Sequence, residues 1–221
     1  MVFRLFGISG LAMSSLFCFG LMAGAAGEPV GSAGRSSEHS SGSASAKSFG
    51  QGSPEADRTA KLTALTAAYN AKEKVAFAKL STAAVGFREA RVENEIDTRN
   101  AAHLALAATE RTALEQDFYD SVITFEQKKA PKFSVAEVRK ENVRMNQMFV
   151  KLMKTTDTLP WGSITKNGII KAQKAWVVYR NAWIEFAKIR ASGVPTDSID
   201  AWVTKKRNQM FDSFLHTTAG A

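Results

Sequence analysis

The chain has 221 residues, of which 45% are hydrophobic and 23% charged, and its formal net charge at pH 7 is +8. Its only cysteine, Cys18, lies within an apolar N-terminal segment. If that segment is removed on export, the rest of the chain has no thiol, which excludes disulfides, cysteine-ligated zinc and a cysteine nucleophile.

Residues 1–26 have the pattern of a secretory signal peptide. Arg4 supplies a positive charge, an apolar stretch covers residues 5–22, and Ala-Gly-Ala follows as a small-residue cleavage pattern. The alternative, a retained membrane anchor, is disfavoured because glycines and serines interrupt the stretch and no basic cluster follows it. Phe17 stands before Cys18, where a lipoprotein signal needs a small residue. We therefore predict a periplasmic or secreted protein with no stable membrane span after cleavage.

Residues 27–53 are dominated by glycine, serine and alanine, with almost no large apolar side chain. Such a composition does not bury enough surface to offset the entropy of ordering the chain. We predict a disordered linker here, in which His39 is solvated.

Helix signals begin at the end of this linker. Ser53 can cap a helix, Pro54 suits its first position, and Glu55 places an acid in its first turn. No strand-like alternation rises above the helical pattern anywhere after this point. We predict a first helical unit over residues 54–127, and the sequence leaves open whether the chain folds back near Ser81 or continues as longer helices. Residues at a spacing of three and four form one apolar stripe: Leu62, Leu65, Tyr69, Phe77, Leu80, Ala84 and Phe87.

A second helical unit is predicted over residues 128–221. Pro131 breaks the first unit, and Ser134 with Glu137 forms a capping box that opens a helix ending near Thr156. Further helices are predicted over residues 165–190 and beyond Pro195. The fold class is therefore all-α, a bundle of about four to five helices built from two related helical units.

Charge is distributed unevenly between these units. Residues 57–127 hold 9 Lys and Arg against 11 Asp and Glu, a net of −2, whereas residues 128–221 hold 17 against 7, a net of +10. The asymmetry indicates that the second unit faces an anionic partner: an envelope polymer, lipid headgroups or the acidic half of a neighbouring molecule. Nucleic acid is not expected, because the chain is predicted to be exported and carries no nucleic-acid motif.

The two units align with each other, which predicts an internal repeat. The spacing between the matched aromatic residues is 18 in the first unit and 27 in the second, and the spacing between arginines is 20 against 27. The additional residues of the second unit lie where residues 159–163 and 191–198 form loops. Duplication followed by loss of these loops from the first unit is therefore the simple interpretation. The matched pairs are Tyr69 with Phe149, Phe87 with Trp176, Arg91 with Arg180, and Arg111 with Arg207.

The motif Gln173-Lys174-Ala175-Trp176-x-x-Tyr179-Arg180, with Met145-Asn146-x-x-Phe149 before it and Thr204-x-x-Arg207 after it, resembles the lysozyme inhibitor LprI-like family. That family consists of small exported bacterial helical domains. The resemblance covers residues 143–214 well and residues 62–114 weakly. Family members usually carry cysteines shortly after the arginine, where this chain has Trp183 and Ile184. The resemblance therefore implies a fold that has lost a stabilising disulfide.

Gln173, Trp176, Tyr179, Arg180 and Trp183 share one helix stripe, which has two interpretations. In the first, the aromatic residues belong to the core and Arg180 pairs with a carboxylate or caps another helix. In the second, Arg180 and Arg207 are exposed contacts at one end of the bundle. The first is the more common arrangement for aromatic stripes.

The resemblance implies that the protein blocks a lysozyme or another cell-wall hydrolase by protein–protein contact. Occluding a cleft needs a rigid scaffold with a protruding loop, and residues 159–163 and 191–196 supply such loops. Trp161 is the best single anchor, with Pro160 and Lys174 as further candidate contacts. Many lysozymes are basic, so the contact would have to come from the acidic first unit, or this chain does something else.

An envelope-binding protein is the alternative function. The basic second unit would bind anionic cell-wall or membrane polymer, and the binding would weaken strongly with salt. The lysines expected to share this attraction are Lys151, Lys154, Lys171, Lys174, Lys205 and Lys206.

Catalysis is not expected. Glu89, Glu93 and Glu95 supply the carboxylates that glycoside hydrolysis needs, but they lie on a face rich in both arginine and glutamate, where solvated ion pairs are ordinary. His103 and His216 have no metal-ligand spacing, and no nucleophile elbow or phosphate loop occurs. We predict neither a cofactor nor a metal.

Overall fold

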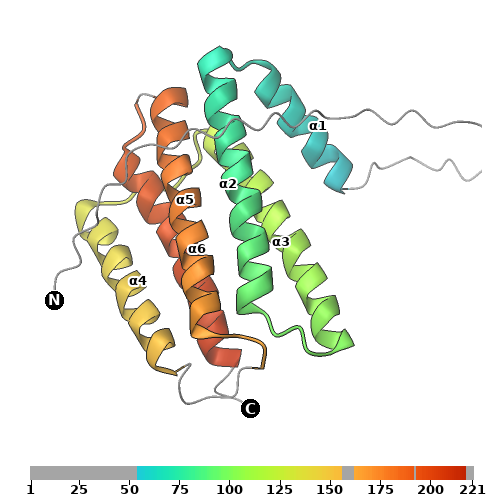
Figure 1. Cartoon of the computed structure of the whole chain (residues 1–221). Helices are drawn as coiled ribbons and strands as arrows, with labels where there is room; N and C mark the ends of the chain where they lie inside the picture. The colour runs from blue at the N-terminus through green and yellow to red at the C-terminus, as the bar shows by residue number, and fades with distance from the viewer. Residues whose placement is uncertain (1–53, 156–161, 192, 218–221) are drawn as a thin grey trace, which may run out of the picture. The chain divides into compact units, whose positions relative to one another are not determined.

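The computed structural model describes residues 54–155, 162–191 and 193–217, and all of the regular secondary structure in these ranges is α-helical (Figure 1). This confirms the predicted all-α class, although the described part holds six helices rather than four to five. The predicted signal peptide and linker lie outside the described residues. The helices are α1 (Pro54–Ala67), α2 (Ala71–Glu95), α3 (Ala101–Glu126), α4 (Val135–Thr155), α5 (Lys166–Arg190) and α6 (Thr196–Thr217).

Local capping decides where the first unit breaks. Asn70 and Glu73 form a capping box at the start of α2, with the Glu73 amide donating to Asn70 Oδ1 at 3.0 Å and the Asn70 amide donating to Glu73 Oε2 at 2.8 Å. Asn100 caps α3 by accepting from the His103 amide at 2.9 Å. The chain therefore turns at residues 68–70 and 96–100, and Ser81 lies within α2 rather than at a turn.

The second unit begins its helices where the sequence predicts. Ser134 accepts from the Glu137 amide, and the Ser134 amide donates to the Glu137 carboxylate at 2.7 Å, as a capping box requires. Thr165 caps α5 through the Gly168 amide at 3.0 Å. Helices α4 and α5 thus begin within one residue of the predicted positions.

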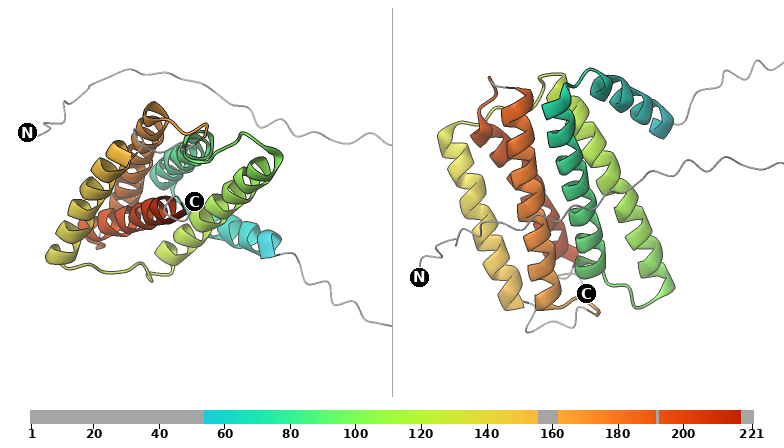
Figure 2. Two further views of the ribbon diagram at one scale, coloured as in Figure 1. Left: turned by 90° about the horizontal axis from the view of Figure 1, so that it is seen from below. Right: turned by 45° about the horizontal axis from the view of Figure 1, so that its top comes forward.

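Helices α2 and α5 form an antiparallel pair at the centre of the domain (Figure 2). Lys79 near the start of α2 bonds Glu185 near the end of α5 at 3.3 Å, and in the middle the rings of Phe87 and Tyr179 stack with centroids 5.5 Å apart. At the other end of the pair, Gly168 approaches Asn94 so closely that an added Cβ would lie 3.1 Å from it.

The remaining helices repeat one arrangement on each side of this pair. Helix α3 packs against both α1 and α2, and α6 packs in the same way against both α4 and α5. Each unit is thus a three-helix group whose middle helix meets the middle helix of the other. The two units thus share one arrangement of their helices.

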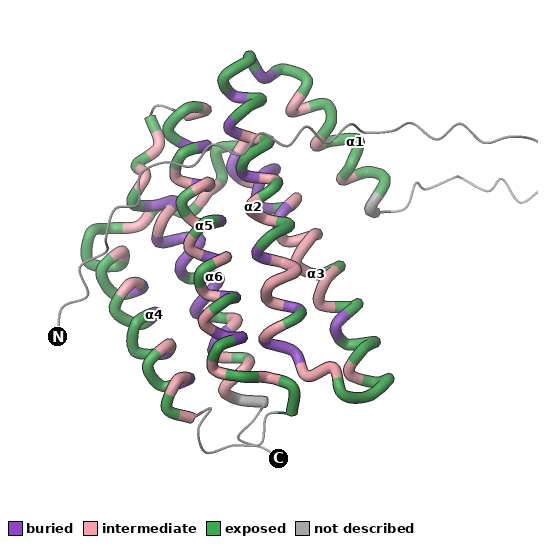
Figure 3. Tube along the Cα trace, in the orientation of Figure 1, coloured by how far each residue is buried: buried purple, intermediate pink, exposed green. Residues whose placement is uncertain are grey.

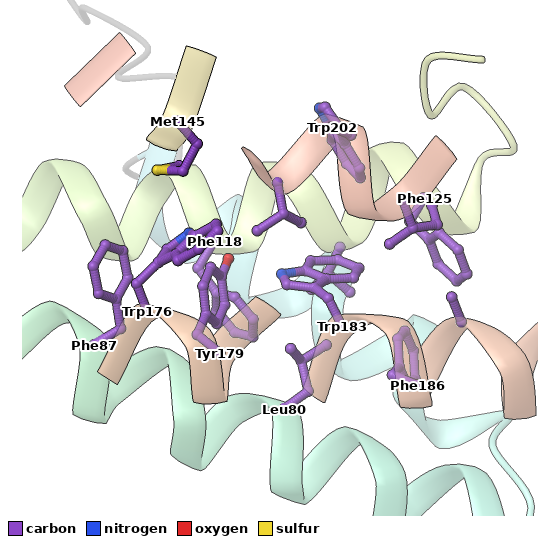
Figure 4. Close-up of a cluster of buried hydrophobic side chains, with 14 of the residues drawn as sticks. Leu80, Phe87, Phe118, Phe125, Met145, Trp176, Tyr179, Trp183, Phe186 and Trp202 are labelled. Atoms are coloured by element: carbon purple, nitrogen blue, oxygen red, sulfur yellow. The ribbon is translucent and has the colours of Figure 1, made fainter. Parts of the chain in front are cut away.

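The core follows the inward faces of the helices (Figure 3). Trp183 lies at its centre and is fully buried, with ring centroids 5.9 Å from Phe125, 6.0 Å from Phe186 and 5.7 Å from Trp202 (Figure 4). Aromatic rings in edge and tilted contact stabilise such a core beyond the area that they bury. A domain without disulfides therefore gains its rigidity from packing between the two units.

Candidate functional site

The motif that carries the family resemblance is a core element. Trp176, Tyr179 and Trp183 are all buried, and burial raises the pKa of the Tyr179 hydroxyl above its ordinary value. Arg180 makes a bidentate ion pair with Asp200 of α6. The aromatic residues of this stripe therefore belong to the core, and Arg180 pairs with a carboxylate. The motif holds α5 against its neighbours.

Arg207 is also a core residue, which contradicts the interpretation of it as an exposed contact. Its side chain is 0% exposed and pairs with Glu95, whose side chain is 5% exposed. One bond joins Arg207 Nη1 to Glu95 Oε2 at 2.8 Å, and Nε donates to Gln173 Oε1 at 3.2 Å. The guanidinium lies 4.1 Å from the ring centroid of Phe211 and 5.3 Å from that of Phe87. Its burial is tolerable because the carboxylate and the rings replace water around the charge.

The predicted match between Arg91 and Arg180 has a structural counterpart. Arg91 of α2 bonds Glu110 of α3 at 3.0 Å, and Arg180 of α5 bonds Asp200 of α6, so each joins the second and third helices of its own unit. Phe87 and Trp176 both line the space between the units. Arg91 and Arg180 therefore make equivalent contacts within their own units.

The predicted match between Arg111 and Arg207 is not supported by their contacts. Arg111 bonds Glu89 at 2.8 Å within the first unit, whereas Arg207 reaches across to Glu95 of the other unit. Burial raises the pKa of Glu89, but the hydrogen bonds from Arg111 and Arg88 outweigh it and lower the pKa below its ordinary value. The two arginines therefore occupy different structural positions.

The glutamates considered for catalysis are used in ion pairs. Glu89 bonds Arg88 and Arg111, and Glu95 bonds Arg207 and lies 3.5 Å from Arg91. Glu93 is exposed. Because its arginine partners lower the pKa of Glu89, that carboxylate is a poor general acid.

The C-terminal end of the loop between α4 and α5 forms hydrogen bonds with the first unit. The Ser163 hydroxyl donates to Asp97 Oδ1 at 3.0 Å, and the Thr98 amide donates to the Ser163 hydroxyl at 3.0 Å. Hydrogen bonds from Arg99 and then from Ser163 hold the pKa of Asp97 well below its usual range, although burial opposes them. Of the predicted loop contacts, Trp161 and Pro160 lie outside the described residues, and Lys174 is exposed on α5.

A serine, an aspartate and a histidine meet at this end of the bundle. His103 Nδ1 lies 3.3 Å from Asp97 Oδ2, and Ser163 bonds the other oxygen of the same carboxylate. A hydrolytic triad needs the imidazole to contact the hydroxyl, with the acid behind it. Here Asp97 lies between the two, so it does not place the imidazole as a base for Ser163.

The outward face of α4 is basic, and the sequence pattern had pointed to only two of its cations, Lys151 and Lys154. Arg139, Lys140, Lys151 and Lys154 are all exposed along it, and none of them makes an ion pair within the part of the chain that the structure describes. We call these four residues the α4 basic face. Of the lysines predicted to share an anionic attraction, all remain exposed except Lys206, which is partly buried and pairs with Asp117.

Exposed valines lie beside these charges. Val135, Val143 and Val150 are exposed on α4, at spacings of eight and seven that place them on one side of the helix. The opposite side buries Met145, Met148 and Leu152 in the core. The signal that identifies this face is the strong amphipathicity of residues 135–155, combined with basic residues on the polar side.

Among the described residues, no helix has both the length and the apolar character that a membrane span needs. No group of histidine, cysteine, aspartate and glutamate side chains in these ranges is arranged to hold a metal ion.

No protein-family model, curated protein sequence or solved structure gives a significant match to this chain.

Proposed function

We propose that this chain is an exported, non-catalytic binding protein of the cell envelope, and that it binds an anionic envelope polymer through the α4 basic face. The observation that carries the proposal is that Arg139, Lys140, Lys151 and Lys154 are exposed and form no ion pair among the described residues. A row of unpaired cations on one helix attracts polyanions, because each charge adds to a common field.

The distribution of ion pairs supports this choice of surface. The described arginines of the first unit all pair with carboxylates, whereas the second unit keeps most of its charge excess exposed. The field of the domain is therefore strongest on the second unit. Val143 and Val150 would add apolar contact to lipid-bearing polymers such as lipopolysaccharide.

The N-terminal pattern supplies the location. A signal peptide followed by a Gly/Ser-rich linker would deliver the helical domain outside the cytoplasm and leave it tethered loosely or free. In the periplasm or outside the cell, anionic polymers are the abundant partners for a basic surface.

The test is binding of the purified protein to lipopolysaccharide micelles at low salt. A variant with Lys140→Gln, Lys151→Gln and Lys154→Gln is compared with a matched variant carrying Lys61→Gln, Lys72→Gln and Lys74→Gln. The control lysines are equally exposed and lie on the first unit. At about 1 kcal/mol per lysine near an anionic surface, the α4 variant should bind roughly 100-fold more weakly.

The control variant should lose much less affinity, by less than about fivefold, because its lysines lie in a region of balanced charge. Equal losses in the two variants would show that only net charge matters. That result would contradict binding through the α4 basic face.

Inhibition of a lysozyme is the second candidate function, and it rests on the family resemblance. The bond from Ser163 to Asp97 favours it, since it holds one end of the α4–α5 loop at the tip of the bundle beside the acidic first unit. Lysis of cell walls by lysozyme, measured with the parent protein and with Trp161→Ala, tests it. Inhibition that resists salt and is lost in the variant would support cleft blocking, and absence of inhibition would leave polymer binding alone.

A further inference from the structure

A cavity of about 210 Å³ lies between α3 and α6, with further walls from α1, α2 and α5. Aromatic rings make up much of its lining. Phe87 and Phe118 face Trp176 and Tyr179 in this region (Figure 4), and Phe77 and Tyr119 add two further rings. The site is separate from the α4 basic face, because no residue of α4 lines it.

The cavity follows from the way the two units join. The α2–α5 pair forms the main contact between them, whereas α3 and α6 are not among the helix pairs that pack closely along their lengths. One side chain bridges the space between these two helices: Lys206 of α6 pairs with Asp117 of α3 and donates to the Ser121 hydroxyl at 2.8 Å. Both Lys206 and Asp117 line the cavity.

The charged groups of the lining are arranged with the cations further inside than the acids. The side chain of Lys206 is 26% exposed and that of its partner Asp117 is 43% exposed. Arg88 is 19% exposed and its partner Glu115 is 44% exposed, with 3.2 Å between Arg88 Nη1 and Glu115 Oε2. An acid on the solvent side can return to water at little cost, because partly exposed ion pairs contribute little. Lys206 would then be available to a ligand, whereas Arg88 would keep its bond to Glu89 at 2.9 Å.

We infer that this cavity binds a small amphipathic carboxylate, whose apolar body lies among the aromatic rings and whose carboxylate replaces Asp117 beside Lys206. Apolar pockets with a few convergent polar groups are the usual form of a small-molecule site. An apolar cavity of about 150 Å³ holds benzene, so this volume corresponds to a body of roughly eight carbon atoms. Octanoate has that length and carries one carboxylate.

The experiment is a titration of the full protein with octanoate, followed by backbone amide NMR shifts around Trp176. Octanol and octylammonium, which share the chain but not the negative charge, are titrated in parallel. Saturable octanoate binding, at least about tenfold tighter than octanol, is expected, since hydrogen bonds to charged groups are among the strong ones. Octylammonium binding as tightly as octanoate would overturn the inference.

Two pairs of variants locate the site. Ala84→Phe fills the cavity from α2 and should abolish binding of octanoate and octanol alike, whereas Ala108→Phe places the same ring on the exposed side of α3 and should change neither. Retained binding in Ala84→Phe would contradict the inference.

The second pair separates a ligand role for Lys206 from a structural one. Lys206→Met should weaken octanoate binding about tenfold and leave octanol binding unchanged. Asp117→Asn removes the competing carboxylate and should tighten octanoate binding. If Lys206 only held α3 to α6, both variants would weaken both ligands, and that result would also overturn the inference.

Discussion

The pair between Arg207 and Glu95 should be the most sensitive point of the fold. We predict that Arg207→Met, which keeps a long apolar side chain but removes the charge, strongly destabilises the domain. The change leaves the Glu95 carboxylate buried, with Arg91 at 3.5 Å as its remaining cation. It also removes the donor to Gln173 and the cation between the rings of Phe87 and Phe211.

The magnitude follows from burial. Removing one partner of a buried pair costs about 3–5 kcal/mol, because the other charge stays desolvated without compensation. Since Arg91 remains near Glu95, we expect the lower end, about 3 kcal/mol. The pair of Arg144 with Asp212 is the matched control: its side chains are 45% and 36% exposed, so Arg144→Met should cost less than about 1 kcal/mol.

Urea unfolding followed by circular dichroism at 222 nm measures both changes. The double variant Arg207→Met with Glu95→Leu should recover most of the lost stability, because it removes the stranded charge together with its partner. A loss of stability in Arg207→Met no larger than that in Arg144→Met would contradict this prediction. A double variant as unstable as Arg207→Met alone would also contradict it.

Three further predictions concern caps, a loop and pH. Asn70→Ala removes the capping box of α2 and should lower the free energy of unfolding by about 1 kcal/mol in the same urea assay. Gly162→Ala should destabilise by about 1 kcal/mol or more, because Gly162 has a φ of +66° and a Cβ there would meet the Asp97 carboxylate. Stability should fall as pH drops below about 4.5, since the pKa values of Glu89 and Asp97 are lowered in the folded protein and protonation releases their arginine partners.

The cap and the pH predictions each have a contrasting measurement. Ala108→Gly, on an exposed part of α3, gives the free energy cost of a helix substitution that affects no cap. Asn70→Asp preserves the cap, so its free energy of unfolding should be higher than that of Asn70→Ala. The acid sensitivity should diminish in Glu89→Gln, because that variant has no carboxylate to titrate. An unchanged pH profile in this variant would contradict the assigned role of its ion pairs.

The sequence predicted the helices well where capping residues stand beside apolar periodicity. Ser134 with Glu137 and the proline at residue 195 mark ends that the structure reproduces within one residue. The turns before α2 and α3 were not predicted. Each of these turns is short and contains neither glycine nor proline, and Asn70 and Asn100 act through side-chain bonds that are common in other contexts too.

The role of the motif stripe was predictable in part. Trp176, Tyr179 and Trp183 follow the spacing of a buried helix face, and the structure buries them. Arg207 was harder to assign, because its partner Glu95 lies 112 residues away in sequence and no local pattern joins them. Long-range ion pairs of this kind depend on how the two units meet, which periodicity does not specify.

The candidate surfaces were also predictable only in part. Net charge identified the second unit as basic, but only the three-dimensional pairing distinguishes Lys206, held by Asp117, from Lys151 and Lys154, which are exposed. The cavity between α3 and α6 was not predicted, because its lining comes from five helices.

The central claim, binding of anionic polymer through the α4 basic face, is tested most directly by the salt dependence of lipopolysaccharide binding. Affinity is measured from about 0.05 M to 0.3 M salt for the parent protein and for the variant lacking Lys140, Lys151 and Lys154. We predict a steep loss of parent affinity as the screening length shortens, and a clearly shallower salt dependence in the variant. Identical salt dependence in the two proteins, or parent binding that does not respond to salt, would contradict the claim.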